Sequence, residues 1–252
     1  MSAGAVICRP GFRMEGMRLK ISICIESDIA AFATGEGLSL SEVPSPEEVD
    51  AAWCLRFLRA IRDVAFATVG TDGLPSVRIV DIMAVTDKRL YFLAPRGKNF
   101  HADVVREGFV ALVGQTPDYR TCRLRGKAVR PEDESAQHAL VDALFELNPS
   151  MNLIYAGERR YICDVFYIED GEGEYFDLGQ RPIFRKSFTL GGAEANARAF
   201  LIEDSCIDCG ICAEKCPELC ITPGSPSVID QSHCLRCGIC QEACPVQAIA
   251  KL

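Results

Sequence analysis

Residues 202–252 constrain the fold of this chain most, because eight cysteines there follow one spacing twice. Each set has the form Cys-x2-Cys-x2-Cys-x3-Cys, and a proline, Pro217 or Pro245, follows it directly. The sets are Cys206, Cys209, Cys212 and Cys216, then Cys234, Cys237, Cys240 and Cys244. A second copy of such an unusual spacing, 28 residues after the first, predicts an internal structural repeat.

This spacing suits iron-sulfur clusters better than other cysteine chemistry. Cysteines at i, i+3 and i+6 can hold three corners of a cubane, and the fourth thiolate must come from elsewhere. Disulfides would not explain why nine of the fourteen cysteines crowd into one segment, and structural zinc uses paired knuckles. The ninth cysteine, Cys220, is interpreted as a small buried thiol, because Ala248 takes its place in the other repeat.

The cysteine-rich segment resembles the bacterial-type ferredoxins that hold two [4Fe-4S] clusters, and every ligand position matches. The resemblance implies that residues 199–252 fold around two clusters, that each cluster moves one electron, and that each takes its fourth ligand from the other repeat. The expected ligands of cluster 1 are Cys206, Cys209, Cys212 and Cys244. Those of cluster 2 are Cys234, Cys237, Cys240 and Cys216.

Composition and charge exclude several kinds of partner. A net charge of −8 is unsuited to nucleic acid, which needs a basic surface. No run approaches the length of about 18 apolar residues that a membrane helix requires. The N-terminal residues lack the apolar core of a secretory signal, so we expect a cytoplasmic protein with no membrane span. Residues 201–252 hold seven acids against three bases, which favours a redox partner protein with a basic docking surface.

The rest of the chain has the pattern of a small β-barrel. Residues 1–44 form an N-terminal extension with little pattern, and Met14 and Met17 leave the true start open. A helix is expected from Ser45 to Ile61, because Ser45-Pro46-Glu47-Glu48 has the signature of a capped start. Further helices are expected over 99–106 and 132–147, and strands over 64–69, 76–85, 90–94, 109–115, 119–129, 161–169 and 174–177. Many short strands with few helices favour a barrel over a doubly wound sheet.

Basic residues near two strand ends suggest a phosphate site within this barrel, expected over residues 45–180. Arg78 lies in an apolar strand, and Lys98 opens a helix after the strand over 90–94. Cationic side chains and free amides at a helix start suit a phosphate. The residues alone leave an equal alternative, in which Arg78 lies on the exposed face of an edge strand and Lys98 is solvated.

A family resemblance favours the phosphate. The segments FATVGTDGLPSVRIVDIMAVTDKRLYFLAPRGKNFHADV and VALVGQTPDYRTCRLRGKAVR resemble the flavin-binding split barrel of the pyridoxamine 5'-phosphate oxidase-like family. The resemblance runs from about Ala51 to Phe176. It implies that Arg78 and Lys98 hold the phosphate of flavin mononucleotide (FMN), and that the protein is a homodimer with the flavin at the subunit interface. The positions matched to residues that pack against the cofactor are Ile79, Val80, Phe92 and Leu93.

The departures from that family limit the activity that can be expected. Thr121 replaces the family's glutamine next to the flavin ring. The C-terminal segment with which the oxidase grips its vitamin substrate is replaced by residues 181–252, of which 181–198 are expected to be a linker. His101, His138 and His233 form no catalytic constellation, and no catalytic residue is assigned. Oxidation of pyridoxamine phosphate is therefore not expected.

Together these patterns predict an α+β, mainly β protein: an FMN-binding split β-barrel with flanking helices, plus a small C-terminal ferredoxin-like domain. The expected function is that of an FMN-dependent oxidoreductase, which passes electrons between two [4Fe-4S] clusters and FMN. A small-molecule acceptor or a redox partner protein would take part. The alternatives are a non-catalytic electron-transfer subunit, or a redox sensor whose barrel serves dimerisation or binds deazaflavin or haem.

Overall fold

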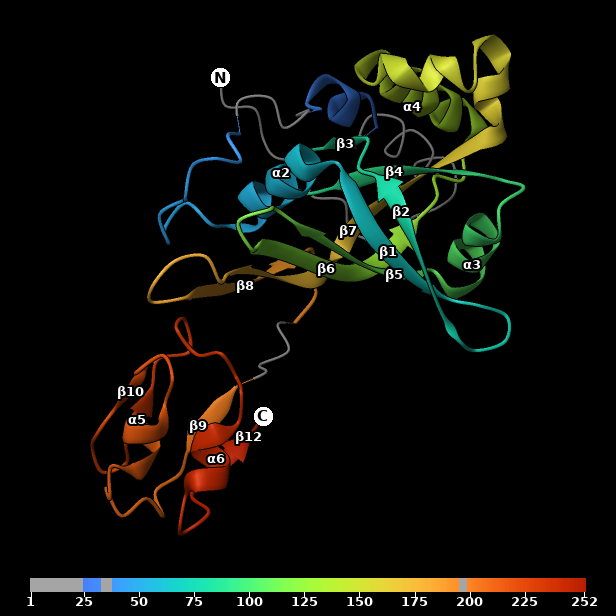
Figure 1. Cartoon of the computed structure of the whole chain (residues 1–252). Coiled ribbons are helices and arrows are strands. Elements are labelled where there is room, and N and C mark those ends of the chain that lie inside the picture. The colour runs from blue at the N-terminus through green and yellow to red at the C-terminus, as the bar shows by residue number, and fades with distance from the viewer. Residues whose placement is uncertain (1–24, 33–37, 195–198) are drawn as a thin grey trace, which may run out of the picture.

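The computed structural model describes residues 25–32, 38–194 and 199–252, which form two lobes (Figure 1). The larger lobe is a β-barrel with flanking helices, and the smaller lobe contains the cysteine-rich residues. Residues 1–24, with the possible starts at Met14 and Met17, lie outside the described residues. In the described part, no helix has both the length and the apolar character needed to cross a membrane.

A single antiparallel sheet forms the barrel, in the strand order β2-β1-β5-β6-β7-β4-β3, with β8 added next to β7. The strands are β1 (Asp63–Val69), β2 (Pro75–Asp81), β3 (Ala84–Val85), β4 (Leu90–Pro95), β5 (Phe109–Gln115), β6 (Arg120–Val129), β7 (Cys163–Asp177) and β8 (Phe184–Leu190). One edge of β7 pairs with the whole of β6 through residues 167–177, and the other edge pairs first with β4 and then with β8. The expected mainly β barrel is confirmed.

The long strand β7 replaces two strands that the sequence predicted around a turn at 170–173. The glycines of this segment allow close approach of neighbouring strands instead of a turn. A Cβ on Gly171 would lie 2.4 Å from the carbonyl oxygen of Arg125, and one on Gly173 would lie 2.2 Å from Cζ of Phe188. Only residues without a side chain fit at these two positions.

Two further boundaries of the barrel differ from the prediction. The strand predicted over 76–85 is divided into β2 and β3. Residues 184–190, expected to belong to a linker, form β8 and pair with β7 over residues 171–177. The barrel sheet therefore continues to Leu190, close to the start of the smaller lobe.

The helix α2 (Ala51–Ile61) begins later than the prediction from Ser45. The side chain of Asp50 caps it by accepting a hydrogen bond from the Trp53 N–H at 2.7 Å. The carboxylate of Glu48 accepts a hydrogen bond from the Ser45 N–H at 2.8 Å, within the turn before the helix. A cap contact at Ser45 thus exists, but it closes a turn.

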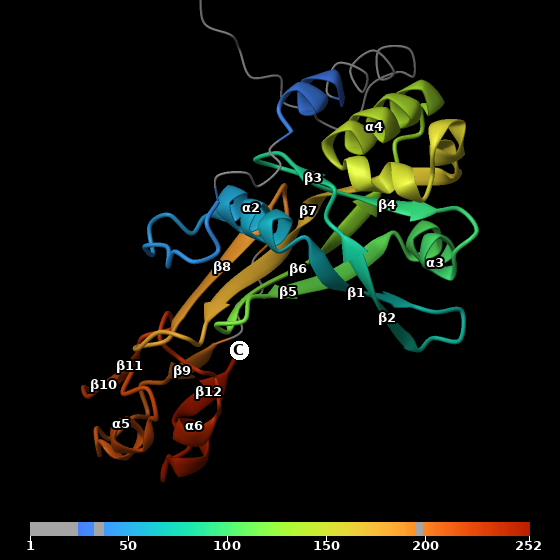
Figure 2. The ribbon, with the colours of Figure 1, turned by 45° about the horizontal axis from the view of Figure 1, so that its top comes forward.

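Helices cover the barrel on three sides (Figures 1 and 2). Besides α2 they are α3 (Asn99–Glu107), α4 (Glu134–Leu147), the helical residues 25–30 and the 3-10 helices η1 (Pro149–Leu153) and η2 (Gly157–Ile162). The barrel interior and α2 share one apolar core, to which α3 contributes Phe100. The outer side of β3, β4 and β7 forms a second core with α4, through residues such as Tyr91 and Leu140.

The smaller lobe consists of two equivalent halves with little regular structure. Its elements are β9 (Phe200–Ile202), α5 (Ile211–Lys215), β10 (Ile221–Thr222), β11 (Val228–Ile229), α6 (Ile239–Ala243) and β12 (Ile249–Lys251). Each short helix follows a glycine with positive φ, 73° at Gly210 and 86° at Gly238. Buried cysteines make up much of its core, together with residues such as Phe200 and Ile249. The similar conformations confirm the repeat that the cysteine spacing predicted.

Candidate functional site

Two cavities in the smaller lobe are lined by cysteines. One is lined by Cys206, Cys209, Cys212 and Cys244, and the other by Cys234, Cys237, Cys240, Cys216 and also Cys220. Each loop of three cysteines is thus joined by the last cysteine of the other repeat. In the described part of the chain, no three ligating side chains lie close enough together to hold a single metal ion. A cubane does not require this, because each of its irons takes one thiolate.

The surroundings of these thiols suit thiolate ligands. The N–H of Arg236 donates to Sγ of Cys234 at 3.3 Å, and the N–H of Ala248 donates to Sγ of Cys244 at 3.2 Å. Backbone hydrogen bonds from Ser227 and Asp208 lower the pKa of Cys206, whereas burial raises the pKa of Cys212 and of Cys240. Such hydrogen bonds stabilise negatively charged sulfur and help to set cluster potentials. The four soft donors of each cavity therefore fit a [4Fe-4S] cluster.

Cys220 lies beside this site as a buried thiol. Its Sγ is 3.5 Å from Sγ of Cys216, one of the predicted ligands of cluster 2. Burial, together with the adjacent Cys216, raises the pKa of Cys220 far above its ordinary value. The protonated thiol can donate a weak hydrogen bond to the neighbouring sulfur.

The loop around Cys234 packs directly against the barrel, next to β8 (Figure 2). The backbone N–H of Arg185 donates to the carbonyl oxygen of Ser232 at 2.8 Å, and its Nε donates to the carbonyl oxygen of Cys234 at 3.2 Å. Nδ1 of His233 donates to the carbonyl oxygen of Ile183 at 2.7 Å. A predicted ligand of cluster 2 is thus held by the barrel itself.

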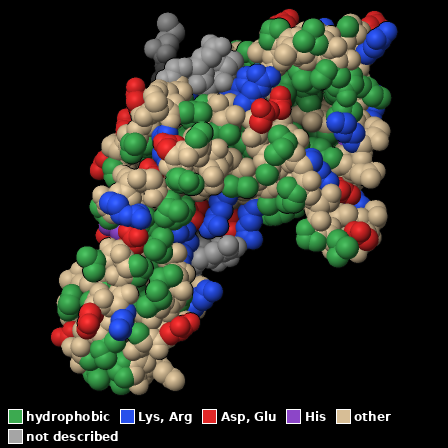
Figure 3. Space-filling view, viewed as in Figure 1, with side chains coloured by type: hydrophobic (Ala, Val, Ile, Leu, Met, Phe, Trp, Pro, Cys, Tyr) green, Lys and Arg blue, Asp and Glu red, His purple; other side chains and the backbone are tan. Residues whose placement is uncertain are grey.

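Glu174 of β7 is the charged centre of this junction and is only 6% exposed. Its carboxylate accepts hydrogen bonds from Arg123 at 2.7 Å, Arg185 at 2.5 Å and Arg236 at 2.7 Å. A buried carboxylate requires such pairing, because an isolated charge is strongly disfavoured away from water. Lys and Arg side chains gather where the lobes meet (Figure 3). Barrel and cysteine loop therefore share one ion-pair network.

The sequence patterns did not single out the residues of this network. Glu174 lies in a strand, where the alternation of apolar and polar residues predicts only which face of the sheet a side chain is on. Arg185 lies where a linker was expected. Arg236 alone left a signal, as an arginine between the first two cysteines of the second repeat. The first repeat has Asp208 in that place.

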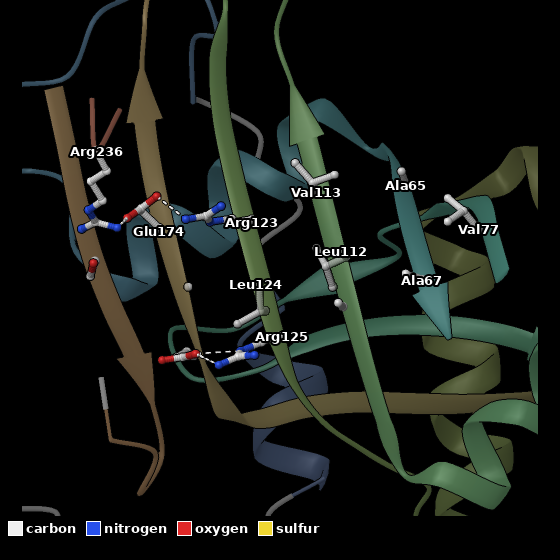
Figure 4. A pocket seen from close by; sticks show the side chains of 14 residues that line it. Ala65, Ala67, Val77, Leu112, Val113, Arg123, Leu124, Arg125, Glu174 and Arg236 are labelled. Carbon is white, nitrogen blue, oxygen red and sulfur yellow. Dashed lines mark hydrogen bonds and ion pairs between the residues drawn. The ribbon is translucent and has the colours of Figure 1, made fainter. Parts of the chain in front are cut away.

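A cavity of about 330 Å³ lies on the outward face of the sheet, beside this network (Figure 4). Three small outward side chains on β1 and β5 form its floor: Ala65, Ala67 and Ala111. Val77 of β2 lies on one side and Arg123 and Arg125 of β6 lie on the other. Arg236 of the smaller lobe also lines it. The cavity thus borders the loop that carries Cys234 and Cys237.

The predicted phosphate residues Arg78 and Lys98 both lie near the start of α3, away from this cavity. Arg78 faces the inner side of β2, where its guanidinium donates to Thr68 Oγ1 at 2.5 Å and stands 4.9 Å from the ring centre of Phe100. Lys98 directly precedes α3 and is exposed. The carboxylate of Asp103, on the same helix, lies 3.7 Å from Arg78 and partly neutralises it. The two bases are thus near one helix start, with one acid beside them.

The other residues predicted to contact the flavin do not converge on one point. Ile79 lies on the outward face of β2, and Val80 is half-buried. Phe92 is fully buried in the barrel core, and Leu93 packs in the core beneath α4. Thr121, whose hydroxyl donates to the carbonyl oxygen of Phe176 at 3.3 Å, lies on β6. It is three strands from β2 and shares the outward face of Arg123, whereas Arg78 faces inward.

A split barrel that carries two repeats of four cysteines defines a redox protein that combines iron-sulfur and flavin-type modules. Residues 53–149 match the family model described as pyridoxamine 5'-phosphate oxidase, and residues 199–222 and 227–250 each match the 4Fe-4S binding domain. Both resemblances stated from the sequence are therefore confirmed. The matches indicate 4Fe-4S electron transfer and a flavin-binding type of barrel.

Solved structures similar to part of this chain include a NimC/NimA family protein from Clostridium acetobutylicum, with 20% identity, a TM-score of 0.47, and coverage of 56% of this chain and 92% of that chain. An FMN-binding protein related to pyridoxamine 5'-phosphate oxidase, from Nostoc punctiforme, has 16% identity, a TM-score of 0.44, and coverage of 61% and 100%. A heme binding protein from Mycobacterium smegmatis has 17% identity, a TM-score of 0.44, and coverage of 58% and 60%. No curated protein sequence matches the chain.

Proposed function

We propose that this chain is a cytoplasmic iron-sulfur flavoprotein, in which two [4Fe-4S] clusters exchange electrons with FMN bound by the barrel. The observation that supports this most is the contact between Arg185 of β8 and the carbonyl oxygen of Cys234. A predicted ligand of cluster 2 is thereby bonded to the barrel, so this cluster would lie against the domain that would bind the flavin. Such a contact favours electron transfer within the molecule.

In this proposal Arg78 and Lys98 bind the phosphate of FMN. The N-terminal amides of α3 add donors at the same place, since the first turn of a helix leaves its N–H groups free. Asp103 and Thr68 hold the guanidinium of Arg78 in position. When bound, FMN can exchange electrons singly with iron-sulfur centres or transfer a hydride to a small molecule.

A homodimer would bring the flavin and cluster 2 together. Arg78 faces the inner side of β2, whereas Arg236 lines the cavity on the outward face of the sheet. A flavin phosphate at Arg78 would therefore lie on the other face of the sheet from Arg236 of its own chain. The outward face carries exposed apolar side chains, with Val77 and Ile79 each 65% exposed, which a second barrel could cover. The flavin of one copy would then lie near Thr121 and Arg236 of the other.

Anaerobic purification with quantification of iron, sulfide and flavin tests the cofactors. We expect about eight irons, eight sulfides and one FMN per chain. Stepwise reduction with dithionite, followed by visible and EPR spectra, then tests the electron transfer. The flavin should be reduced together with the clusters. Its reduction should be faster than the reduction of free FMN by the same concentration of dithionite. A flavin that stays oxidised while both clusters are reduced would contradict the proposal.

A second candidate function is supported by the contact of Asp103 with Arg78. A carboxylate 3.7 Å from the guanidinium opposes the binding of a phosphate there and already pairs the cation. The chain would then be an electron-transfer subunit or a redox sensor without FMN. Absence of FMN from the anaerobic preparation, with both clusters present, would support this candidate. The visible spectrum would reveal deazaflavin or haem in its place.

A further inference from the structure

The two cysteine repeats have the same backbone but opposite charge at one position. Asp208 follows Cys206 by two residues, and Arg236 follows Cys234 by two residues. Both residues have positive φ, 50° and 56°. Non-glycine residues seldom adopt this conformation, so the two loops present their side chains in the same way. A difference in charge between them therefore marks a difference in what the two loops contact.

The loop of the second repeat faces inward. Arg236 donates to Glu174 at 2.7 Å, and the neighbouring residues Ser232, His233 and Cys234 all form hydrogen bonds with β8 or the segment just before it. The barrel thus contributes the acid Glu174, and the cysteine loop contributes the base Arg236 that pairs with it. This is one redox domain docked on another through complementary charge.

The loop of the first repeat faces outward. Asp208 is exposed and its carboxylate accepts a hydrogen bond from the Gly224 N–H at 3.0 Å, and Ile207 is 61% exposed. In the described residues, the hydrogen bonds of the loop from Cys206 to Cys209 connect only to residues 199–252. Cys209 is exposed, as its counterpart Cys237 is, but Cys206 is half-buried whereas its counterpart Cys234 is buried. A predicted cluster 1 would therefore be closer to solvent than to the barrel.

We propose that cluster 2 is the inner cluster, which serves the barrel, and that cluster 1 is the outer cluster, at which electrons enter or leave the chain. The outer loop docks a redox protein that has a basic surface around its own cofactor. Asp208 provides the charge that selects this partner, just as Arg236 selects Glu174. Each encounter transfers one electron and no proton, so a reduced cluster that donates to a ferric haem yields one ferrous haem.

This inference rests on the proposed function for the presence of the clusters and for the identity of the inner acceptor, but the order of the two clusters does not require a flavin. Its test therefore uses cluster potentials and an external acceptor. Ferric cytochrome c is a suitable probe, because it is a basic one-electron acceptor with a strong visible signal. The protein is the full chain with both clusters loaded and reduced by a stoichiometric amount of dithionite.

Substitutions at the equivalent positions should shift the two clusters in opposite directions. Removing the positive charge in Arg236→Gln should lower the midpoint potential of one cluster, because an added electron loses a favourable neighbour. Removing the negative charge in Asp208→Asn should raise the potential of the other cluster. EPR-monitored redox titration resolves both shifts. The idea fails if both substitutions act on the same cluster, or if neither shifts any potential.

The rate of cytochrome c reduction tests the outer surface. Asp208→Asn should slow it about two- to threefold at low salt and weaken its dependence on ionic strength, as loss of a steering charge does. Glu132→Gln removes the same charge from the exposed surface of the larger lobe just before α4, away from the smaller lobe (Figure 1), and should leave the rate within about 20% of the wild-type value, because a charge far from the docking site steers little. If Glu132→Gln slows the reaction as much as Asp208→Asn does, the outer loop is not the docking site.

The inner contact has its own readout. In Arg236→Gln the loop from Ser232 to Cys237 should exchange its amide hydrogens about tenfold faster than in the wild type, because its anchor on Glu174 is lost. Arg236→Lys keeps the charge and should restore most of the protection. An unchanged exchange rate in Arg236→Gln would refute the assignment of the inner cluster. A chain without flavin but with these cluster properties would overturn the proposed function and leave this inference standing.

Discussion

The carboxylate of Glu174 lies 2.7 Å from the guanidinium of Arg236, so a buried acid in the middle of a barrel strand fixes a loop of the cysteine-rich lobe. Removing that acid leaves the positive charges of Arg185 and Arg236 unpaired at a largely buried junction. We expect Glu174→Gln to lower the free energy of unfolding by about 2–4 kcal/mol. Urea denaturation followed by circular dichroism measures this change.

The matched control for that substitution is Glu172→Gln on the same strand and the same face. Glu172 pairs with Arg125, which is nearer to solvent, so the loss should be below about 1 kcal/mol. Equal losses at the two positions would show that burial does not determine how much Glu174 contributes to the free energy of unfolding.

Removal of the clusters should unfold the smaller lobe and spare the barrel. The lobe has two five-residue helices and a core built largely from cysteines, so little else holds it together. After anaerobic treatment with a chelator and an oxidant, residues 199–252 should lose amide protection, whereas strands β5 and β6 should keep theirs. Hydrogen-deuterium exchange by mass spectrometry reports both parts in one sample. Retained protection in residues 199–252 would contradict the dependence of this lobe on its metal.

Arg78→Gln should weaken FMN binding by about tenfold or more, the loss expected for one charge-assisted hydrogen bond. Lys98→Gln should act in the same direction. Lys127→Gln removes a surface charge from β6 that pairs with Asp170 at 3.6 Å, and it should leave the affinity unchanged. Fluorescence titration of the apo-flavin protein with FMN gives the dissociation constants. Equal affinities in all three variants would show that the phosphate binds elsewhere.

Asp164 should make stability depend on pH in the acid range. Burial alone would raise the pKa of Asp164, but hydrogen bonds from Arg130, His101 and Arg96 outweigh it, so the pKa lies below its ordinary value. A depressed pKa adds stability that is present above the unfolded value of about 3.9 and is lost as the pH falls through the folded pKa. The loss of stability in Asp164→Asn should thus be about 2–4 kcal/mol near pH 7 and shrink below about pH 4.

Chemical denaturation at a series of pH values tests this expectation. Asp170→Asn is the control, because Asp170 pairs with Lys127 at the surface and should change stability by less than about 1 kcal/mol at any pH. A difference between Asp164→Asn and wild type that stays constant from pH 7 to about pH 3 would rule out a titrating role for Asp164.

Gly173 should not tolerate a side chain. A Cβ there would lie 2.2 Å from Cζ of Phe188 and 2.6 Å from the carbonyl oxygen of Arg123, and that backbone atom cannot move without breaking the pairing of β6 with β7. Gly173→Ala should therefore destabilise the protein by about 1–3 kcal/mol. Gly192→Ala, with nothing within 4 Å of its Cβ, should change stability by less than about 0.5 kcal/mol. Thermal denaturation separates the two variants.

The same glycines show why the sequence predicts some of this structure and not the rest. The cysteine spacing and the alternation in strands such as β5 are local patterns, and they predict the repeats and most strand positions. Gly171 and Gly173 have the local signature of a turn, yet their role depends on Gly126 and Phe188, which are distant in sequence. Likewise, Ser45 has the local signature of a cap, yet Asp50 caps the helix five residues later. The contact of Glu174 with Arg236 joins residues 62 positions apart, so it follows only from the docking of two lobes.

The bond between Arg185 and the carbonyl oxygen of Cys234 also changes the kinetics available to this chain. A ferredoxin in solution must find its acceptor by collision, so its rate of delivery falls on dilution. In the proposed dimer the cysteine-rich lobe of one copy is held beside the flavin of the other, and the effective concentration of one at the other is fixed at about the millimolar level or above. Transfer should therefore be first order at any protein concentration at which the dimer persists, and only exchange with outside molecules should depend on how often they meet.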